Sequence, residues 1–422
     1  MGPSKPRLWN ILGPGLITGA ADDDPSGIAT YSQAGARFGY QLGWTLLITY
    51  PLMVVIQSIC ARIGRTTGRG LAGNLREFYP RWLLICIVAL LFIANTLNIG
   101  ADLGAMGAAM RLLLPQLPAW AYVGAFGAIT TIAQVVLQYI RYVATLKWLT
   151  LSLFAYFATL AVVHLSWSDL LRGLVWPTFS NSQEFWMMVV AILGTTISPY
   201  LFFWQAAQEV EDTKADPVRV PLLENPRQGK KALERIQLDT LVGMGFSNLV
   251  ALAILVTGAA TLHASGVTQI DTAAQAAEAL RPIAGTFAFA IFALGIIGTG
   301  LLSIPVLAGS AAYAVGEAQG WKVGLANQPL QAKAFYGAII AATVLGAAAN
   351  FFELNPVKAL VWSAVINGVV AVPVMALLLM MSSRASIMGR FTISTSWKVL
   401  GWVATGLMVA ATLAFALSTA FG

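Results

Sequence analysis

Three consecutive carboxylates stand in the middle of the first apolar stretch of the chain. Asp22, Asp23 and Asp24 are flanked by mostly apolar residues on both sides, from 11 to 36. Ionisable side chains inside such a stretch are costly to bury, and in a membrane they mark an ion or substrate pathway by default. Asp22 and Asp23 also fit a simpler interpretation, as helix caps or residues of an exterior loop. The apolar flanks place Asp24 near the middle of the span.

The residues after the carboxylates predict a broken helix. Pro25 has no N–H and clashes with the preceding turn, so a helix cannot run straight through it. Gly27 permits the dihedral angles of an unwound stretch. Non-helical backbone at membrane depth is tolerated only where protein or a water-filled cavity covers it. We therefore expect the break to face a cavity.

A second apolar segment, 185–208, repeats this interruption. Its middle reads Gly-Thr-Thr-Ile-Ser-Pro-Tyr, with Pro199 as the helix breaker. One such proline would indicate only a kink. Two interrupted spans in corresponding places, the first and the sixth, are the best sequence indication of an inverted-repeat transporter.

The two breaks together predict a site built from oxygen atoms. Asp24 supplies a charge, the unwound backbone near Gly27 and Thr195 supplies carbonyl oxygens, and Thr196 and Ser198 supply hydroxyls. Such a set suits a hard cation. We expect Asp24, Gly27, Thr195 and Ser198 to bind it.

Further polar residues within the spans are expected to support this site or to line its pathway. Asp102 supports the ligands, carries a proton, or makes only a helix-packing hydrogen bond. Asn367 faces either the cavity or a neighbouring helix. The full set is Asp22, Asp23, Asp102, Thr196, Tyr200, Gln205 and Asn367.

Composition places the chain in a membrane. Of 422 residues, 58% are hydrophobic and only 10% are charged, whereas soluble proteins carry about 25% charged residues. The net charge of +7 does not indicate nucleic-acid binding, because the basic residues fall in the predicted loops. Two cysteines and two histidines provide neither a disulfide framework nor a thiolate metal site. We expect no cofactor, and no catalytic constellation points to an enzyme.

A span needs about 20 apolar residues, and the sequence predicts eleven of them. A short terminus, 1–10, precedes a first repeat at 11–165 and a second repeat at 185–381, which contains a polar loop at 209–235; an eleventh span follows. The predicted spans are 11–36, 43–63, 82–112, 119–140, 145–165, 185–208, 238–263, 284–314, 334–351, 357–381 and 399–420.

Basic residues predict the orientation of these spans. With the N-terminus inside, 20 of the 25 Lys and Arg residues fall in inner loops, as the positive-inside rule requires. The N-terminus is then cytoplasmic and, after eleven spans, the C-terminus lies outside. The longest loop, 209–235, is expected to be a mobile cytoplasmic connection.

Short motifs in the first part of the chain resemble those of the natural resistance-associated macrophage protein (Nramp) transporters. The resemblance is dense over 11–76 and thinner beyond. It implies a LeuT-type fold of five plus five helices and an eleventh, with helices 1 and 6 broken, which carries divalent metals such as manganese and iron. The motifs are Gly13-Pro14-Gly15, Asp24-Pro25-Ser26-Gly27, Arg37-Phe38-Gly39-Tyr40, Gln57-Ser58, Ala61-Arg62, Thr67-Gly68-Arg69, Asp102-Leu103 and the Thr195–Tyr200 stretch.

The chain departs from the family at residues that bear on substrate. Ser26 and Gly27 stand where the family has Gly and the metal-binding Asn, and Ser198 and Tyr200 stand where it has Met and His. A thioether favours soft transition metals, so its replacement by Ser198 removes that preference. Magnesium transporters related to Nramp also lack this methionine.

The residues of the family's proton path are largely missing as well. Asp102 matches the family's Asp, but Ala105 replaces a Glu, and the family's paired arginines are missing near 334–337. We therefore expect weak proton coupling or none.

The sequence thus favours a secondary transporter or facilitator in a bacterial plasma membrane. It would move Mg²⁺ or Mn²⁺ inward by alternating access. The alternative is a transporter of a small organic solute on the same fold, with Asp24 paired to an amine. A sensor or scaffold would need an appended soluble domain, which the sequence lacks. The oligomeric state is not predicted.

Overall fold

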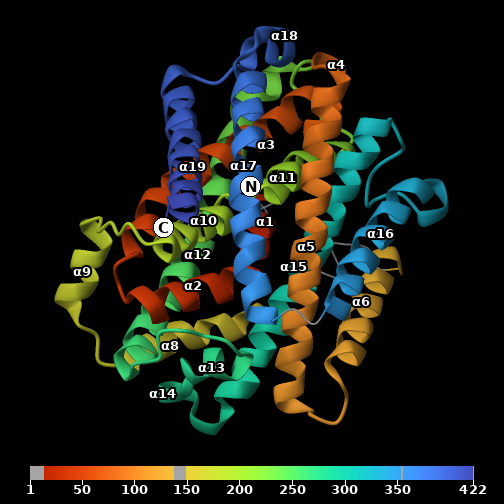
Figure 1. Ribbon diagram of the computed structural model, residues 1–422. Coiled ribbons are helices and arrows are strands. Elements are labelled where there is room, and N and C mark those ends of the chain that lie inside the picture. The colour runs from red at the N-terminus through yellow and green to blue at the C-terminus, as the bar shows by residue number, and fades with distance from the viewer. Residues whose placement is uncertain (1–13, 137–148, 353–354, 422) are drawn as a thin grey trace, which may run out of the picture.

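A computed structural model describes residues 14–136, 149–352 and 355–421, and over these residues the protein is helical throughout, without strands. Figure 1 shows long helices forming the body, with α4 and α18 at one end and α13 and α14 at the other. The helices are α1 (Pro14–Asp22), α2 (Pro25–Phe38), α3 (Gly43–Thr67), α4 (Leu71–Phe78), α5 (Arg81–Leu113), α6 (Ala119–Val136), α8 (Phe154–Val162), α9 (Trp167–Val175), α10 (Gln183–Thr196), α11 (Pro199–Ala215), α12 (Gly229–Thr261), α13 (Ala273–Glu278), α14 (Arg281–Ala284), α15 (Ala288–Gln319), α16 (Lys333–Ala349), α17 (Pro356–Ser383), α18 (Ala385–Met388) and α19 (Thr395–Phe421).

Nine helical segments within the described residues are long and apolar enough to cross a membrane. Each coincides with one predicted span. The first predicted span is not among the nine because it is divided into helices of 9 and 14 residues. The fifth, 145–165, begins outside the described residues, and its described part contains the short apolar helix α8.

Both predicted breaks are present, and they are shorter than expected. Only Asp23 and Asp24 separate α1 from α2, and only Ile197 and Ser198 separate α10 from α11. A proline opens the second half of each broken helix, where its missing N–H costs nothing and its fixed φ suits a first helical turn.

The connection predicted at 209–235 is shorter in the structure and is packed against the body. Helix α11 continues to Ala215 and α12 begins at Gly229. Between them, the amides of Leu222 and Leu223 donate to the last carbonyls of α3, each at 3.2 Å. The end of α11 and the start of α12 are rich in charged residues, a pattern that predicts a loop. Ion pairs such as that between Arg235 and Glu209 hold these helix ends against the rest of the fold. Helix α9 likewise occupies a connection for which no helix was predicted.

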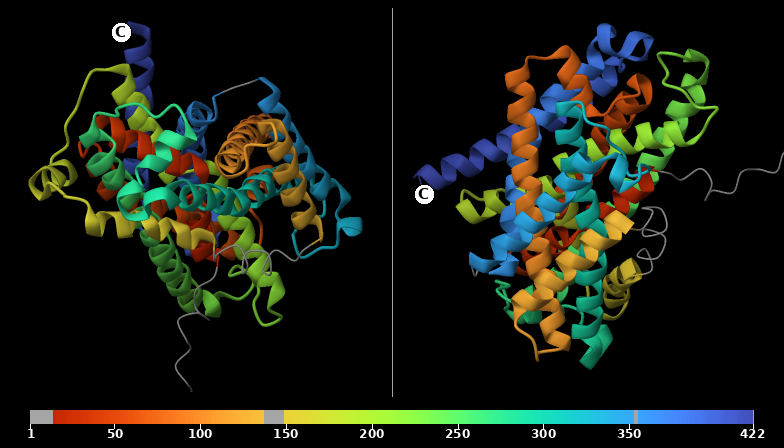
Figure 2. Two further views of the ribbon diagram at one scale, coloured as in Figure 1. Left: turned by 90° about the horizontal axis from the view of Figure 1, so that it is seen from below. Right: turned by 90° about the vertical axis from the view of Figure 1, so that its right-hand side faces the viewer.

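Close helix packing positions the first break. Helix α12 packs along both α1 and α2, and Gly19 lies so near Gly243 that a methyl group on Gly19 would collide with the Gly243 carbonyl. Helix α5 packs against α15 and α17, which brings its polar middle towards α2. Helix α19 packs against α17, α10 and α3, and its C-terminal end extends away from the body in both views of Figure 2.

Candidate functional site

Asp24 is the N-cap of α2 at the first break. Its backbone is extended (φ −73°, ψ 171°), and its Oδ1 accepts hydrogen bonds from the Gly27 amide at 2.7 Å and the Ser26 hydroxyl at 2.6 Å. A carboxylate at this position accepts hydrogen bonds from free N–H groups of the first turn. Its negative charge also interacts favourably with the positive end of the helix dipole. Gly27 therefore lies inside the first turn of α2, not in the unwound stretch where the sequence placed it. Asp24 is buried, with 1% exposure.

Ser198 stands at the equivalent position of the second break and behaves differently. Its hydroxyl donates back to the carbonyls of Gly194 at 2.7 Å and Thr195 at 2.9 Å and caps nothing in α11. Pro199 has no N–H to offer the Thr195 carbonyl, so the Ser198 hydroxyl takes over that role. The Thr196 hydroxyl also donates back along α10, to Ile192.

The two breaks meet in the centre of the molecule. The Tyr200 hydroxyl donates to the carbonyl of Ala21 at 3.2 Å, which satisfies an acceptor at the end of α1. A Cβ on Gly27 would lie 3.1 Å from Oγ1 of Thr195, so these two predicted site residues face each other across the breaks. Further along α1 and α11, the Thr18 hydroxyl donates to the side-chain oxygen of Gln205.

A chain of polar side chains joins Asp24 to the middle of α5. Nδ2 of Asn98 lies 3.2 Å from Oδ2 of Asp24 and 3.3 Å from Oδ2 of Asp102. Nδ2 of Asn367 donates to Oδ1 of Asn98 at 2.9 Å, and the Ser303 hydroxyl donates to Asp102 at 3.1 Å. The structure therefore brings Asp102 and Asn367, both predicted site residues, towards Asp24 through a residue that was not predicted.

Asp22 and Asp23 are fully buried, so they are not in an exterior loop. Both lie beside one hydroxyl on α12: Ser247 Oγ is 2.6 Å from Oδ2 of Asp22 and 3.2 Å from Oδ1 of Asp23. A hydroxyl has one proton to donate, so it fully serves only one of the two carboxylates.

The part of the chain that the structure describes offers none of these carboxylates a basic partner. Within the described residues, no Lys, Arg or His nitrogen lies within 4.0 Å of Asp22, Asp23, Asp24 or Asp102. A buried carboxylate is normally paired, protonated or bound to a cation. In the same residues no three His, Cys, Asp or Glu side chains gather to hold a metal. A cation here would therefore need amide, hydroxyl, carbonyl or water oxygens as well.

Sequence reasoning missed three residues of this site: Asn98, Ser247 and Ser303. The signal for Asn98 was present, because it precedes Asp102 by four residues and so shares its helix face. The two serines carry no such signal, since only the packing of α12 and α15 brings them to the breaks.

A cavity of about 220 Å³, lined by both apolar and charged side chains, lies between α2, α10 and α17, near the end that carries α13. Its basic side chains are neutralised: Arg37 pairs with Glu184, and Lys358 lies 3.5 Å from Asp271. The segment after α12 lies over α2, where the Gln33 amide exchanges hydrogen bonds with the backbone at Thr268 and Ile270. That segment also contributes Gln269 and Ile270 to the wall of the cavity.

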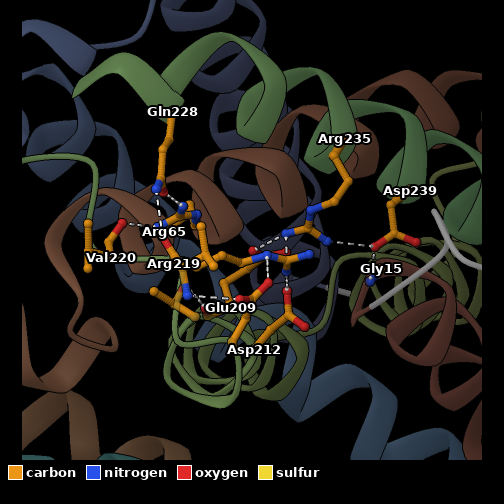
Figure 3. Close-up of polar contacts among 12 residues, drawn as sticks. Gly15, Arg65, Glu209, Asp212, Arg219, Val220, Gln228, Arg235 and Asp239 are labelled. Carbon is orange, nitrogen blue, oxygen red and sulfur yellow. Dashed lines mark hydrogen bonds and ion pairs between the residues drawn. The ribbon is translucent and has the colours of Figure 1, made fainter. Parts of the chain in front are cut away.

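A second group of acidic side chains lies nearer the other end together with two arginines, and of the acids Glu209 and Asp239 are fully buried. We term it the charged cluster: Glu209, Asp212, Arg219, Arg235 and Asp239. Arg235 bonds Glu209 and lies 3.7 Å from Asp212 and 4.0 Å from Asp239, as Figure 3 shows. Arg219 pairs with Asp212. Asp239 also accepts from the amide of Gly15 at 2.7 Å, so the cluster fixes the first turn of α1.

Comparison with known proteins places these features in context. The family model described as "Natural resistance-associated macrophage protein-like" matches residues 15–418. The protein of Pseudomonas aeruginosa named divalent metal cation transporter MntH 1 is 29% identical over 423 residues, which covers 96% of this chain and 91% of the relative. The divalent metal cation transporter MntH of Chromohalobacter salexigens is 30% identical over 313 residues, which covers 71% of this chain and 69% of the relative.

Solved structures agree on the fold. The manganese transporter of Eremococcus coleocola superimposes with a TM-score of 0.73 at 19% identity, covering 99% of this chain and 88% of that one. Mhp1, a nucleobase-cation-symport-1 family transporter, gives a TM-score of 0.56 at 13% identity, covering 96% and 92%. These likenesses confirm the predicted class of membrane fold, and the names of the relatives agree with the expectation of a transporter and not an enzyme.

Proposed function

The chain belongs to the Nramp-like family and is a multi-pass membrane protein, and from this premise we propose that it carries divalent metal cations across the membrane. The observation that carries the proposal is the group of buried carboxylates at the first break, which has no basic partner within the described residues. Buried carboxylates without a counter-charge are costly, and a bound cation would supply one. The relatives of this chain are named divalent metal cation transporters, which supports a divalent metal as the cargo.

In this proposal Asp24 is the charged ligand and the second break completes the site. Thr195 faces Gly27 across the breaks, and the carbonyls that Ser198 now caps become available if its hydroxyl turns away. Tyr200 and Gln205 link the second broken helix to α1. Asp22 and Asp23 hold α12 against the first break through Ser247, and Thr196 bonds within α10. No thioether lies in the set, so oxygen ligands dominate and favour hard ions such as Mg²⁺ together with Mn²⁺.

Transport proceeds by alternating access between two closed ends. Asp24 is buried in this structure, so each end must open in turn. At one end, the segment after α12 must leave Gln33 on α2. At the other, α1 must leave Asp239. In our proposal, residues 11–165 and 185–381 are the two repeats, and the end with the charged cluster faces the cytoplasm of a bacterial cell. The N-terminus then lies inside and the C-terminus outside.

Cation flux tests the proposal. The purified chain is reconstituted into liposomes that contain a fluorescent indicator, and Mg²⁺, Mn²⁺ or Ca²⁺ is added outside. Uptake above that of protein-free liposomes for Mg²⁺ or Mn²⁺ is the expected result. Absence of uptake for all three cations, with accumulation of a small amine or amino acid instead, would support the organic-solute alternative.

A further inference from the structure

The amide of Asn98 occupies a position that suits a cation better than a hydrogen-bond donor. Asn98 is fully buried on α5, and its Nδ2 lies between two carboxylates, 3.2 Å from Asp24 and 3.3 Å from Asp102. Both distances end on one nitrogen, so the two carboxylate oxygens lie within about 6.5 Å of each other, the sum of the two. We propose that Asn98 is itself a cation ligand, and that the cation lies between Asp24 and Asp102 when the Asn98 amide turns its oxygen towards them. This inference rests on the proposed function.

The two carboxylates have unused capacity to bind. Within the described residues, Oδ1 of Asp102 is buried without a hydrogen-bond partner, and Oδ2 of Asp24 accepts a hydrogen bond from Asn98 at 3.2 Å. Neither group has a basic partner among the described residues. The donors to these two carboxylates are neutral: the shared Asn98 amide, the hydroxyls of Ser26 and Ser303, and the Gly27 backbone amide. Two buried like charges without a counter-charge are costly, and a divalent cation would neutralise both at once.

The neighbouring amide allows Asn98 to turn over without losing its partner. At present Nδ2 of Asn367 donates to Oδ1 of Asn98, while Oδ1 of Asn367 is buried with no partner. An amide carries a donor and an acceptor at the same distance from its axis. If both amides rotate by half a turn, Nδ2 of Asn98 donates to the free Oδ1 of Asn367, and Oδ1 of Asn98 faces the carboxylates. Asn367 is therefore a positioning residue.

The resulting ligand set consists of oxygens. Asp24 and Asp102 supply carboxylates and Asn98 supplies an amide carbonyl, with the Ser303 hydroxyl beside Asp102. This is a site for a hard divalent cation, which keeps some of its water. It also moves the centre of the site from the second break towards α5, and replaces the amide that the family motif has at the position of Gly27.

The experiment compares two asparagines one turn apart on α5. Binding of Mn²⁺ and Mg²⁺ to the full-length purified chain is measured by calorimetry for wild type, Asn98→Ala, Asn98→Asp and Asn95→Ala. Asn95 is the matched control, because it is also fully buried but donates to Leu307 and Ser310. We expect Asn98→Ala to weaken binding of both cations at least tenfold and Asn95→Ala to leave it within twofold.

Asn98→Asp separates a ligand from a hydrogen-bond donor. An aspartate has an oxygen for the cation but no N–H for the carboxylates. A ligand role predicts affinity equal to or tighter than that of wild type, whereas a donor role predicts a loss like that of Asn98→Ala. Melting temperatures with and without MnCl₂ give a second readout, and Asn98→Ser replaces Asn98→Ala if the latter does not fold.

The outcomes distinguish this inference from the proposed function. If wild type binds Mn²⁺ or Mg²⁺ and Asn98→Ala binds equally well, or if Asn98→Asp loses binding, the assignment of Asn98 is overturned and the transporter stands. If wild type binds and transports no divalent cation, the proposed function fails, and this inference fails with it.

Discussion

Two regions of this protein bury carboxylates, and they satisfy them in opposite ways. In the charged cluster, the fully buried Glu209 is bonded to Arg235, whose side chain is 17% exposed. At the first break, Asp22, Asp23 and Asp24 are buried to a similar degree, but their donors in the described part of the chain are hydroxyls, an amide side chain and backbone amides. In the charged cluster, arginine side chains supply fixed counter-charges, whereas the described residues around the first break supply none.

This difference separates a structural role from a ligand role. Arginine satisfies a buried carboxylate with fixed donors, so the charged cluster needs no further ion and can hold α1, α11 and α12 together. A group that must take up and release a cation cannot hold an arginine in the same place. The carboxylates at the break accordingly have neutral neighbours, which can orient them without neutralising them.

The largest expected effect comes from neutralising Asp24 alone. Asn is as good an N-cap as Asp, so Asp24→Asn keeps the cap of α2 and removes only the charge. We expect transport to fall more than 100-fold while the protein still elutes as a folded species. Asp239→Asn in the charged cluster is the control for cation binding: calorimetry should show that it keeps the Mn²⁺ affinity that Asp24→Asn loses. Near-normal uptake by Asp24→Asn would end the assignment of the site.

Replacing Arg235 should have the opposite pattern of effects to Asp24→Asn. The protein should lose stability, and its affinity for the cation should not change. Arg235→Met leaves Glu209 buried without its partner, which costs about 3–5 kcal/mol of unfolding free energy. Thermal unfolding in detergent measures the loss, and calorimetry with Mn²⁺ should give an unchanged dissociation constant. Lys230→Met on the same helix is a suitable control, since Lys230 is exposed. Weaker Mn²⁺ binding by Arg235→Met would mean that the two regions are not separate.

A cation should stabilise the protein through the uncompensated carboxylates only. At a free concentration 100 times its dissociation constant, a ligand of the folded state adds about 2.7 kcal/mol of stability. We expect Mn²⁺ or Mg²⁺ to raise the melting temperature of wild type and of Asp239→Asn but not of Asp24→Asn, and chelation to reverse the effect. An equal rise in all three proteins would point to binding elsewhere.

Ser198→Met is expected to change selectivity by a smaller factor. The thioether would replace a hydroxyl that now donates to Gly194 and Thr195, and a soft ligand favours Mn²⁺ or Cd²⁺ over Mg²⁺. We expect a shift of about tenfold, equivalent to about 1.4 kcal/mol, in competition assays. If the rank order of the cations is unchanged, the side chain at 198 does not face the ion.

The smallest effect expected is that of cation uptake on internal pH. Within the described residues, the Asp102 carboxylate accepts hydrogen bonds from Asn98 and Ser303, and neither side chain hands a proton onward at neutral pH. Liposomes that contain a pH-sensitive dye should show no acidification as Mg²⁺ or Mn²⁺ enters. Acidification that follows cation uptake and disappears in Asp102→Asn would show that transport is coupled to protons.

Local features of the fold could be predicted because local chemistry sets them. Pro25 and Pro199 interrupt their helices through their own rings, so the sequence located both breaks, and Asp24 caps α2 with atoms no more than three residues away. The prediction from local sequence alone is wrong at 209–235, where a run of charged residues indicates a loop although helices occupy both of its ends. Their ion pairs, such as Arg235 with Glu209, join different helices and cannot be seen in a local pattern.

The sequence by itself determined that the chain is built of apolar helices, that two of them break, and that Asp24 stands at one break. Only the tertiary structure decided which side chains surround Asp24. Asn98 is 74 residues away and Ser247 more than 220, and they reach the break because α5 and α12 pack beside it. Helix breaking depends on bonds within one turn, whereas a binding site depends on distances between helices, which are fixed by the packing of the whole bundle.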